Sequence, residues 1–259
     1  LAGAVAIVAL QRWRGGTLRT PVPGLHAMRS VSGVAAMCLW FHALGGLPLA
    51  TATTLNYMSS VWMAMFLIGG AIMLGGQRVD ARLIATILAG FAGVALILRP
   101  TIEQDQLWHG LIGLLSGMVS ATAYLQVTAL GRAGEPEYRI VFYFSLGGVV
   151  AGAASMLWTG ITPHRTLEGP AYLLAVGLLA SIAQLLMTRA YGTGRTLVVA
   201  SLQYLGIAFA FLYGVLLFDE RITAMSVLGM ALIVGAGLGA SLLRQQTAPL
   251  DARQSTLES

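Results

Sequence analysis

Two amide–tyrosine pairs are the side chains of this sequence best suited to chemistry. Asn56-Tyr57 and Gln203-Tyr204 each follow a leucine inside a long apolar segment, and the pairs are 147 positions apart. Amides and phenols donate and accept hydrogen bonds without carrying charge at neutral pH. They suit reversible binding of a polar solute, and they supply no strong base or nucleophile. The pairs therefore predict a binding site and no catalytic residue.

Further polar residues recur three or four positions apart within the apolar segments, so each set shares one helix face. The two sets are Thr53, Asn56, Tyr57 and Ser60, and Ser116, Ser120 and Tyr124. A polar group left unpaired in lipid costs free energy, so both faces should point into the protein. The candidate substrate-binding residues are Asn56, Tyr57, Trp62, Tyr124, Gln126, Gln184, Gln203 and Tyr204.

Packing is the alternative role for these residues. Membrane helices use Ser, Thr, Asn and Gln side chains to hydrogen-bond to one another, at about 1 kcal/mol per bond. Trp62 lies nearer the expected membrane centre than a tryptophan of the interfacial belt should, so lining a cavity and packing between helices are both open for it.

The composition is that of an integral membrane protein. Hydrophobic residues make up 57% of the chain and charged residues only 10%, whereas about a quarter of an ordinary soluble domain is charged. All fifteen basic residues are arginines, and they lie between the apolar segments instead of clustering on a soluble face. A nucleic-acid partner is therefore not expected.

Several kinds of site are missing from the sequence. The ten acidic residues all fall in expected loops, at span ends or in the C-terminal tail, so proton coupling through a carboxylate at mid-membrane is unsupported. There is no His/Cys cluster, HExxH, GxSxG or P-loop motif. We expect no enzyme activity, no metal and no cofactor.

The offset of 147 also relates other positions without gaps. Ala36 falls on Ala183, and Gly45 falls on Gly192. Such a repeat of apolar helices is typical of duplicated membrane transporters. The ten apolar residues of Leu1–Leu10 are too few to span a bilayer. By the repeat, we expect the sequence to be a fragment without its first membrane helix and about half of its second.

Hydropathy and the positions of charges predict eight helices in an all-α bundle. They are Ser30–Leu47, Thr51–Leu74, Leu83–Leu98, Gly110–Leu130, Ile140–Trp158, Pro170–Thr188, Thr196–Phe218 and Ile222–Leu243. The expected domains are a truncated first repeat at 1–103, a second repeat at 104–244 and a polar, disordered cytoplasmic tail at 245–259.

Arginine counting predicts the orientation. Twelve arginines collect on one side of the membrane and three on the other, which indicates a cytoplasmic C-terminus. The twelve are Arg12, Arg14, Arg19, Arg29, Arg78, Arg82, Arg132, Arg139, Arg189, Arg195, Arg244 and Arg253. With the two missing or incomplete helices added to the eight, each repeat has five membrane spans. Because five is an odd number, the second repeat should enter the membrane inverted relative to the first. The inversion would bring Asn56 and Gln203 toward the midplane from opposite faces.

The segment from Ser30 to Leu243 resembles the drug/metabolite transporter superfamily, specifically its ten-helix EamA-type exporters. The matching stretches are Arg29-Ser30-Val31-Ser32-Gly33, Trp40-Phe41-His42-Ala43-Leu44, Leu47-Pro48-Leu49-Ala50-Thr51-Ala52, and Phe218-Asp219-Glu220-Arg221-Ile222-Thr223 with Gly229 and Gly235. The family's glutamate before the tenth helix is matched by Glu220, whereas Gln77 stands at the equivalent place in the first repeat. We expect Glu220 to cap a helix or to serve packing.

The resemblance implies a multi-pass carrier of the inner (plasma) membrane, with two inverted five-helix halves around a central cavity. It implies export of a small metabolite or an amino acid by alternating access. The uncharged candidate residues favour neutral or zwitterionic solutes, and a homodimer is left open. A membrane scaffold and a channel are the alternatives, but a scaffold gives no reason for polar faces that approach the midplane in inverted copies.

Overall fold

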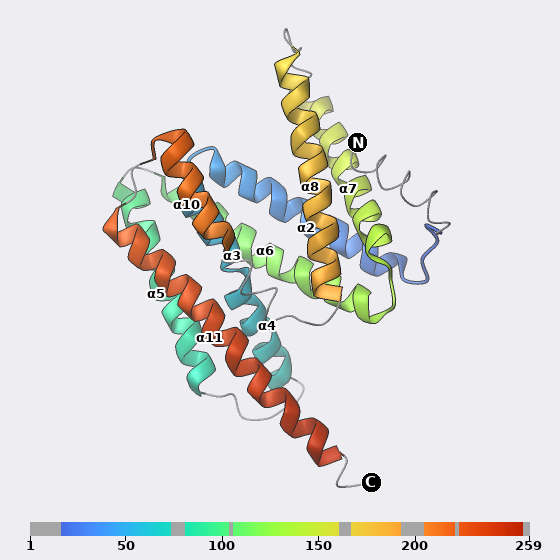
Figure 1. The fold of residues 1–259 in the computed structure, drawn as a ribbon, viewed down its shortest axis with the longest axis vertical. Helices are drawn as coiled ribbons and strands as arrows, with labels where there is room; N and C mark the ends of the chain where they lie inside the picture. Colours follow the sequence, from blue (N-terminus) through green and yellow to red (C-terminus); the bar gives the residue numbers. More distant parts are fainter. Residues whose placement is uncertain are drawn as a thin grey trace. The chain divides into compact units, whose positions relative to one another are not determined.

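The computed structural model describes residues 17–73, 81–103, 106–160, 167–192, 205–220 and 223–255. These residues form helices and contain no strand (Figure 1). The helices are α2 (Pro23–Leu44), α3 (Leu49–Tyr57), α4 (Ser59–Met73), α5 (Ala81–Glu103), α6 (Leu107–Arg132), α7 (Glu137–Thr159), α8 (Glu168–Gly192), α10 (Leu205–Phe218) and α11 (Ala224–Ser255).

Within the described residues, four helices, α2, α6, α7 and α8, are long and apolar enough to cross a bilayer. The 26 residues of α6 extend over about 39 Å at 1.5 Å per residue, more than the ~30 Å of a hydrocarbon core. Helices satisfy their backbone hydrogen bonds internally, which lipid requires. The prediction of an all-α membrane protein is confirmed.

One predicted helix is divided in the structure. The segment expected at Thr51–Leu74 forms α3 and α4, which separate at Met58. The Met58 N–H lies near two carbonyls, Thr54 O at 3.2 Å and Leu55 O at 3.3 Å, as in the tightened turn at a helix end. A second difference is at the C-terminus, where α11 continues to Ser255 although a disordered tail is expected from Gln245. Gln245, Gln246 and Ala248 are helix formers, whereas Pro249 in the same extension removes a helical hydrogen bond, so propensity alone does not account for the extension.

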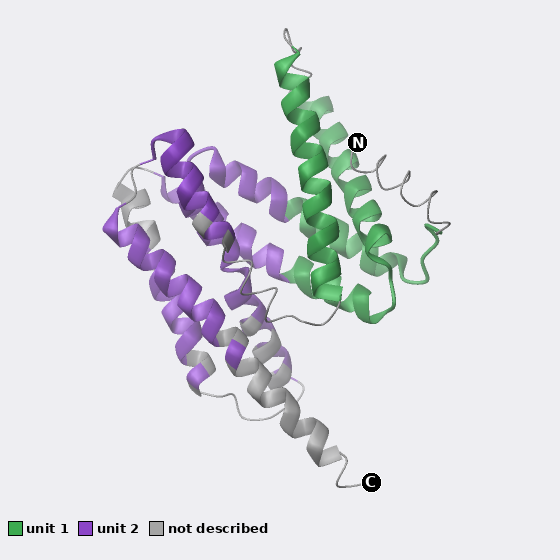
Figure 2. Ribbon diagram, viewed as in Figure 1, with its two compact units in different colours: residues 1–35, 122–196 green, residues 36–121, 197–259 purple. Residues whose placement is uncertain are grey.

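The chain forms two compact units (Figure 2). Unit 1 comprises Leu1–Ala35 and Thr122–Thr196, and it holds the beginning of α2, the end of α6, and all of α7 and α8. Unit 2 comprises Ala36–Ala121 and Leu197–Ser259. Each unit therefore draws residues from both predicted repeats, and the repeat boundary at 103/104 stays a prediction.

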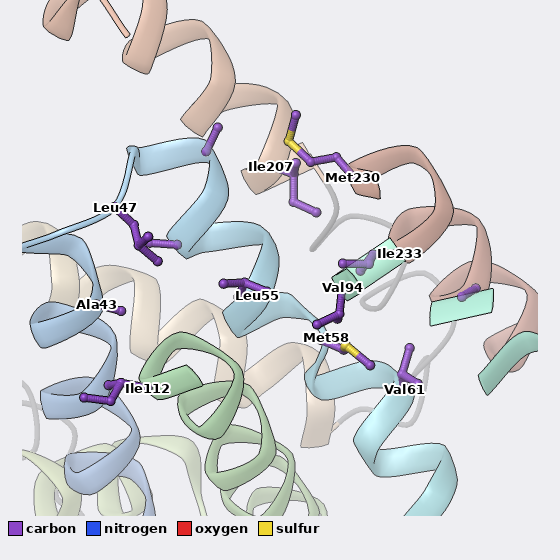
Figure 3. Close-up of a cluster of buried hydrophobic side chains, with 13 residues drawn as sticks. Ala43, Leu47, Leu55, Met58, Val61, Val94, Ile112, Ile207, Met230 and Ile233 are labelled. Atoms are coloured by element: carbon purple, nitrogen blue, oxygen red, sulfur yellow. The ribbon is translucent and has the colours of Figure 1, made fainter. Parts of the chain in front are cut away.

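The apolar core of unit 2 gathers side chains from most of its helices (Figure 3). Leu55, Met58 and Ile233 are fully buried there. Helix α5 packs closely on α11, since a Cβ at Gly93 would lie 2.7 Å from the Gly229 carbonyl oxygen. Close backbone contact through glycine is a common way for membrane helices to gain van der Waals energy.

Candidate functional site

In unit 2, the two predicted polar faces meet at Asn56. Its Nδ2 atom donates to Ser116 Oγ at 3.0 Å and to Ser120 Oγ at 3.2 Å, which ties α3 to α6. Ser116 Oγ itself donates to Gly113 O at 2.6 Å, so its lone pairs are directed to the amide. Both serines are buried, whereas Asn56 is half-buried. The prediction that these faces point into the protein is confirmed for these three residues.

Glycines of α6 allow this approach. A Cβ at Gly117 would lie 2.6 Å from Leu55 O and 2.9 Å from Asn56 O, and a Cβ at Gly113 would lie 3.2 Å from Leu55 Cδ1. The α6 backbone is therefore pressed against the last turn of α3, directly before the break at Met58. This contact supports packing as one function of the Asn56 cluster.

Tyr57 and Trp62 pack at the edge of the unit 2 core. The Trp62 ring meets Phe91 edge-on at a centroid distance of 5.3 Å, and the Tyr57 ring lies against Gly206, where there is no side chain in its way. The Trp62 Nε1 atom is buried and has no hydrogen-bond partner among the described residues. Substrate contact by these two rings stays a prediction.

In unit 1, three candidate residues each contact a side chain of another helix. Tyr124 of α6 stacks on Tyr191 of α8 at a centroid distance of 5.3 Å. Gln126 Oε1 accepts a hydrogen bond from Ser32 Oγ, and Gln184 Oε1 accepts one from Arg29 Nη2 at 3.2 Å. Ser32 and Arg29 are three positions apart on α2, so both glutamines reach the same helix face.

Arg29 is a residue of this site that the sequence analysis missed, because it counts Arg29 only among the cytoplasmic-side arginines. The side chain is 3% exposed, and its guanidinium carbon lies 4.4 Å from the centroid of the Phe144 ring. The Arg29 side chain folds back over Gly33, where a Cβ would collide with Nη1 and lie 2.8 Å from Phe144 Cε2. The sequence signal for this contact is Gly33, four positions after Arg29, because a glycine one helical turn away leaves room for the arginine side chain.

Glu135 is a second buried charge, in the turn between α6 and α7. Its carboxylate accepts hydrogen bonds from Thr20 Oγ1 at 2.8 Å and Arg139 Nη1 at 2.9 Å, and His26 Nε2 lies 3.1 Å away. Burial alone raises the pKa of Glu135, but these hydrogen bonds and the Arg139 charge together hold it below the ordinary value. Arg139 also donates to Thr17 O, so the cluster anchors the chain that precedes α2.

The remaining candidates, Gln203 and Tyr204, lie outside the described residues, and so does Gln77. No group of three or more His, Cys, Asp or Glu side chains suited to a metal ion occurs in the part of the chain that the structure describes. A cavity of about 620 Å³ between α2 and α7 is lined mainly by apolar side chains, including Val34, Leu146 and Val150, and contains no candidate residue.

Residues 107–242, more than half of the chain, match the EamA-like transporter family. The chain belongs to this family. This EamA-like protein is 31% identical over 240 residues to the pseudopaline exporter CntI of Pseudomonas aeruginosa, an alignment that covers 92% of this chain and 82% of the exporter. It is 29% identical over 234 residues to a riboflavin transporter of Rhizobium johnstonii, covering 88% of this chain and 74% of that protein.

A solved crystal structure has the same fold as this EamA-like protein. The TM-score is 0.62 at 20% sequence identity, and the match covers 93% of this chain and 85% of the other. At this identity the likeness describes the fold alone. The family match and the exporter and transporter relatives make this protein a membrane transporter.

Proposed function

We propose that this EamA-like protein is a secondary transporter that exports a small metabolite or an amino acid by alternating access. The observation that carries the proposal is the hydrogen bonding of Asn56 to two serines inside otherwise apolar helices of a transporter-family chain. Interhelical hydrogen bonds in membranes average only about 0.6 kcal/mol. A solute could therefore replace them at small cost.

In this proposal the solute binds at the candidate residues of the sequence. They are Asn56, Tyr57, Trp62, Tyr124, Gln126, Gln184, Gln203 and Tyr204. The two named relatives export pseudopaline and transport riboflavin, which supports a small-molecule substrate. The arrangement of two inverted repeats would supply the alternating access.

Efflux from proteoliposomes tests the proposal. Vesicles containing the full chain are loaded with labelled amino acids, and efflux is measured with and without unlabelled solute outside. A carrier gives saturable efflux that external solute accelerates. Flux that never saturates would indicate a channel, and no protein-dependent flux would indicate a scaffold.

The double variant Asn56→Ala/Gln203→Ala identifies the residues involved. We expect it to lower kcat/KM by about 10-fold or more, the effect of losing roughly 1.4 kcal/mol of solute binding. Thr54→Val is the matched control, because Thr54 is buried on the same helix and its Oγ1 donates only to Ala50 O in the described structure. Equal loss in both variants would contradict a binding role.

Thiol labelling tests alternating access directly. Cys38 is exposed, so it must first be replaced by serine. Cysteines placed at Asn56 and Gln203 should then react with impermeant reagents from alternate sides of the membrane, and a solute that is transported should change both rates. Reaction from neither side would contradict the proposal.

We also propose that the protein lies in the inner membrane with a cytoplasmic C-terminus, from the bias of its arginines. A C-terminal fusion to a reporter that is active only in the cytoplasm should be active. Activity of a C-terminal reporter that works only outside the cytoplasm would overturn this orientation.

A further inference from the structure

We propose that Arg29 binds a carboxylate group of the transported solute. The inference rests on the transport function proposed above and names the chemistry of its substrate. It concerns unit 1 alone, where Arg29 of α2 lies beside Gln184 of α8 and Phe144 of α7.

The buried charge of Arg29 is unbalanced. A guanidinium stays protonated in proteins, so this side chain is a permanent cation that is 3% exposed. Its Nε and Nη1 atoms are buried and have no hydrogen-bond partner among the described residues. A buried charge without a counter-charge costs free energy, and a bound anion would recover it.

The contrast with Arg139 sharpens this argument. Arg139 is also buried, but its Nη1 atom lies 2.9 Å from the Glu135 carboxylate, and its remaining nitrogens donate to Thr17 O. In the described part of unit 1, every side-chain nitrogen of Arg139 therefore has a hydrogen-bond acceptor. At Arg29 the same part provides a single neutral acceptor, Gln184 Oε1.

Phe144 and Gly33 hold the Arg29 guanidinium in place. Phe144 lies under its face at 4.4 Å, and cation–π contact of this kind uses the face of the group while its N–H donors point outward in the plane. Gly33 leaves the space that Nη1 occupies. Two parallel N–H donors of a guanidinium match the two oxygens of a carboxylate. Nε and Nη1 lie on different edges of the group, so a bidentate pair at Arg29 would combine one of them with the second N–H of Nη2, beside Gln184 Oε1.

Predicted substrate-binding residues contact this face of α2. Gln184 contacts Arg29, and Gln126 contacts Ser32 three positions later. Both amides can rearrange to donate to a carboxylate, since each carries two N–H groups. The uncharged candidates alone favour neutral or zwitterionic solutes, and Arg29 adds recognition of the carboxylate end.

Paired probes test the proposal. Purified protein in detergent is heated with succinate, L-alanine or L-leucine, and separately with the matched carboxamides, to measure ligand-dependent stabilisation. The same pairs are then used in proteoliposome efflux. We expect the wild type to prefer carboxylates, and Arg29→Gln to lose roughly 10- to 100-fold of that preference, as for hydrogen bonds to a charged group.

Three variants separate binding from packing. Arg29→Lys keeps the charge but not the planar fork, so it should raise the KM for carboxylates and leave kcat nearly unchanged. If Arg29→Gln does not fold, Arg29→Lys takes its place in the test. Ser30→Ala removes the hydrogen bond from Ser30 Oγ to Tyr143 O, which joins α2 to α7, and should retain the preference for carboxylates. Arg132→Gln, at an exposed position, is the matched control and should behave as wild type.

The outcomes distinguish the two proposals. If carboxylates and carboxamides are moved equally well, and Arg29→Gln changes neither, the carboxylate site is wrong and transport stands. If Ser30→Ala loses the preference as Arg29→Gln does, Arg29 has a structural role. If carboxylates stabilise the wild type but no solute is moved, the transport proposal fails while the anion site is supported.

Discussion

The carboxylate of Glu220 accepts a hydrogen bond from the backbone nitrogen of Leu49 at 2.7 Å. Leu49 is the first residue of α3, and Pro48 before it supplies no side-chain cap. Glu220 comes from the connection between α10 and α11, so one predicted repeat caps a helix of the other. The expectation of an end-capping role for Glu220 agrees with this contact, which places one oxygen of a negative carboxylate at the positive end of a helix.

Replacing Glu220 should therefore destabilise the fold. Glu220→Ala leaves the Leu49 N–H without its acceptor, and we expect a loss of about 1 to 2 kcal/mol, as for removal of a helix cap. Glu220→Gln keeps an acceptor but removes the charge, so its loss should be smaller. Thermal unfolding in detergent measures both. Glu168→Ala is the control, since Glu168 is exposed in the first turn of α8; a larger effect there would contradict the capping argument.

Gly117→Ala should separate α6 from α3. Its Cβ would lie 2.6 Å from the Leu55 carbonyl oxygen, and a backbone atom cannot move aside cheaply. We expect a loss of about 1 to 3 kcal/mol, typical of overpacking. The matched substitution Gly148→Ala places its Cβ in open space on α7 and should be neutral or slightly stabilising. Similar unfolding temperatures for the two variants would show that the contact is not tight.

Hydropathy is sufficient to predict the extent of most helices, because lipid demands long apolar helical segments. The predicted span at Ile140–Trp158 differs from α7 by three residues at its beginning and one at its end. The break at Met58 is not predictable in this way. It has no proline, and it follows a contact with Gly117, which is distant in the sequence.

The candidate site is predicted in part for a similar reason. Helical spacing places Asn56, Ser116 and Ser120 on inward faces, and the structure joins them. Burial of Arg29 depends on Phe144 and Gln184, which lie on other helices. Counting arginines assigns a side of the membrane to each charge but does not distinguish a buried arginine from one at the lipid headgroups.

A double-mutant cycle should detect the interhelical hydrogen bond of Asn56. Asn56→Ala and Ser116→Ala, alone and together, should show a coupling energy of about 0.6 kcal/mol and no more than about 1.7 kcal/mol, the range measured for such bonds in membranes. Ser181→Ala provides the additive control with Asn56→Ala, because Ser181 lies on α8 and donates to Gly177 O of its own helix. A coupling of zero for the Asn56–Ser116 pair would mean that the contact does not stabilise the fold.

Acid should weaken the Glu135 cluster. The pKa of Glu135 is lowered by Thr20, Arg139 and His26 despite its burial, so the folded protein binds this proton less readily than the unfolded chain. The stabilisation is therefore fully present above the ordinary pKa of 4.5 and is lost as the pH falls through the lower folded-state value. The contribution of Glu135 to the free energy of unfolding should change little between pH 7 and pH 5.5, and it should decline below pH 5.5.

Glu135→Gln makes this prediction specific. The amide cannot titrate, so the variant should be less stable at neutral pH and should lose less stability on acidification than the wild type. Glu137→Gln is the control, because Glu137 is half exposed and lies 4.0 Å from an exposed Arg189; pairs of this kind contribute little. If wild type and Glu135→Gln lost stability in parallel between pH 5.5 and pH 3.5, the carboxylate of Glu135 would not be the group that anchors residues 17–20 to α7.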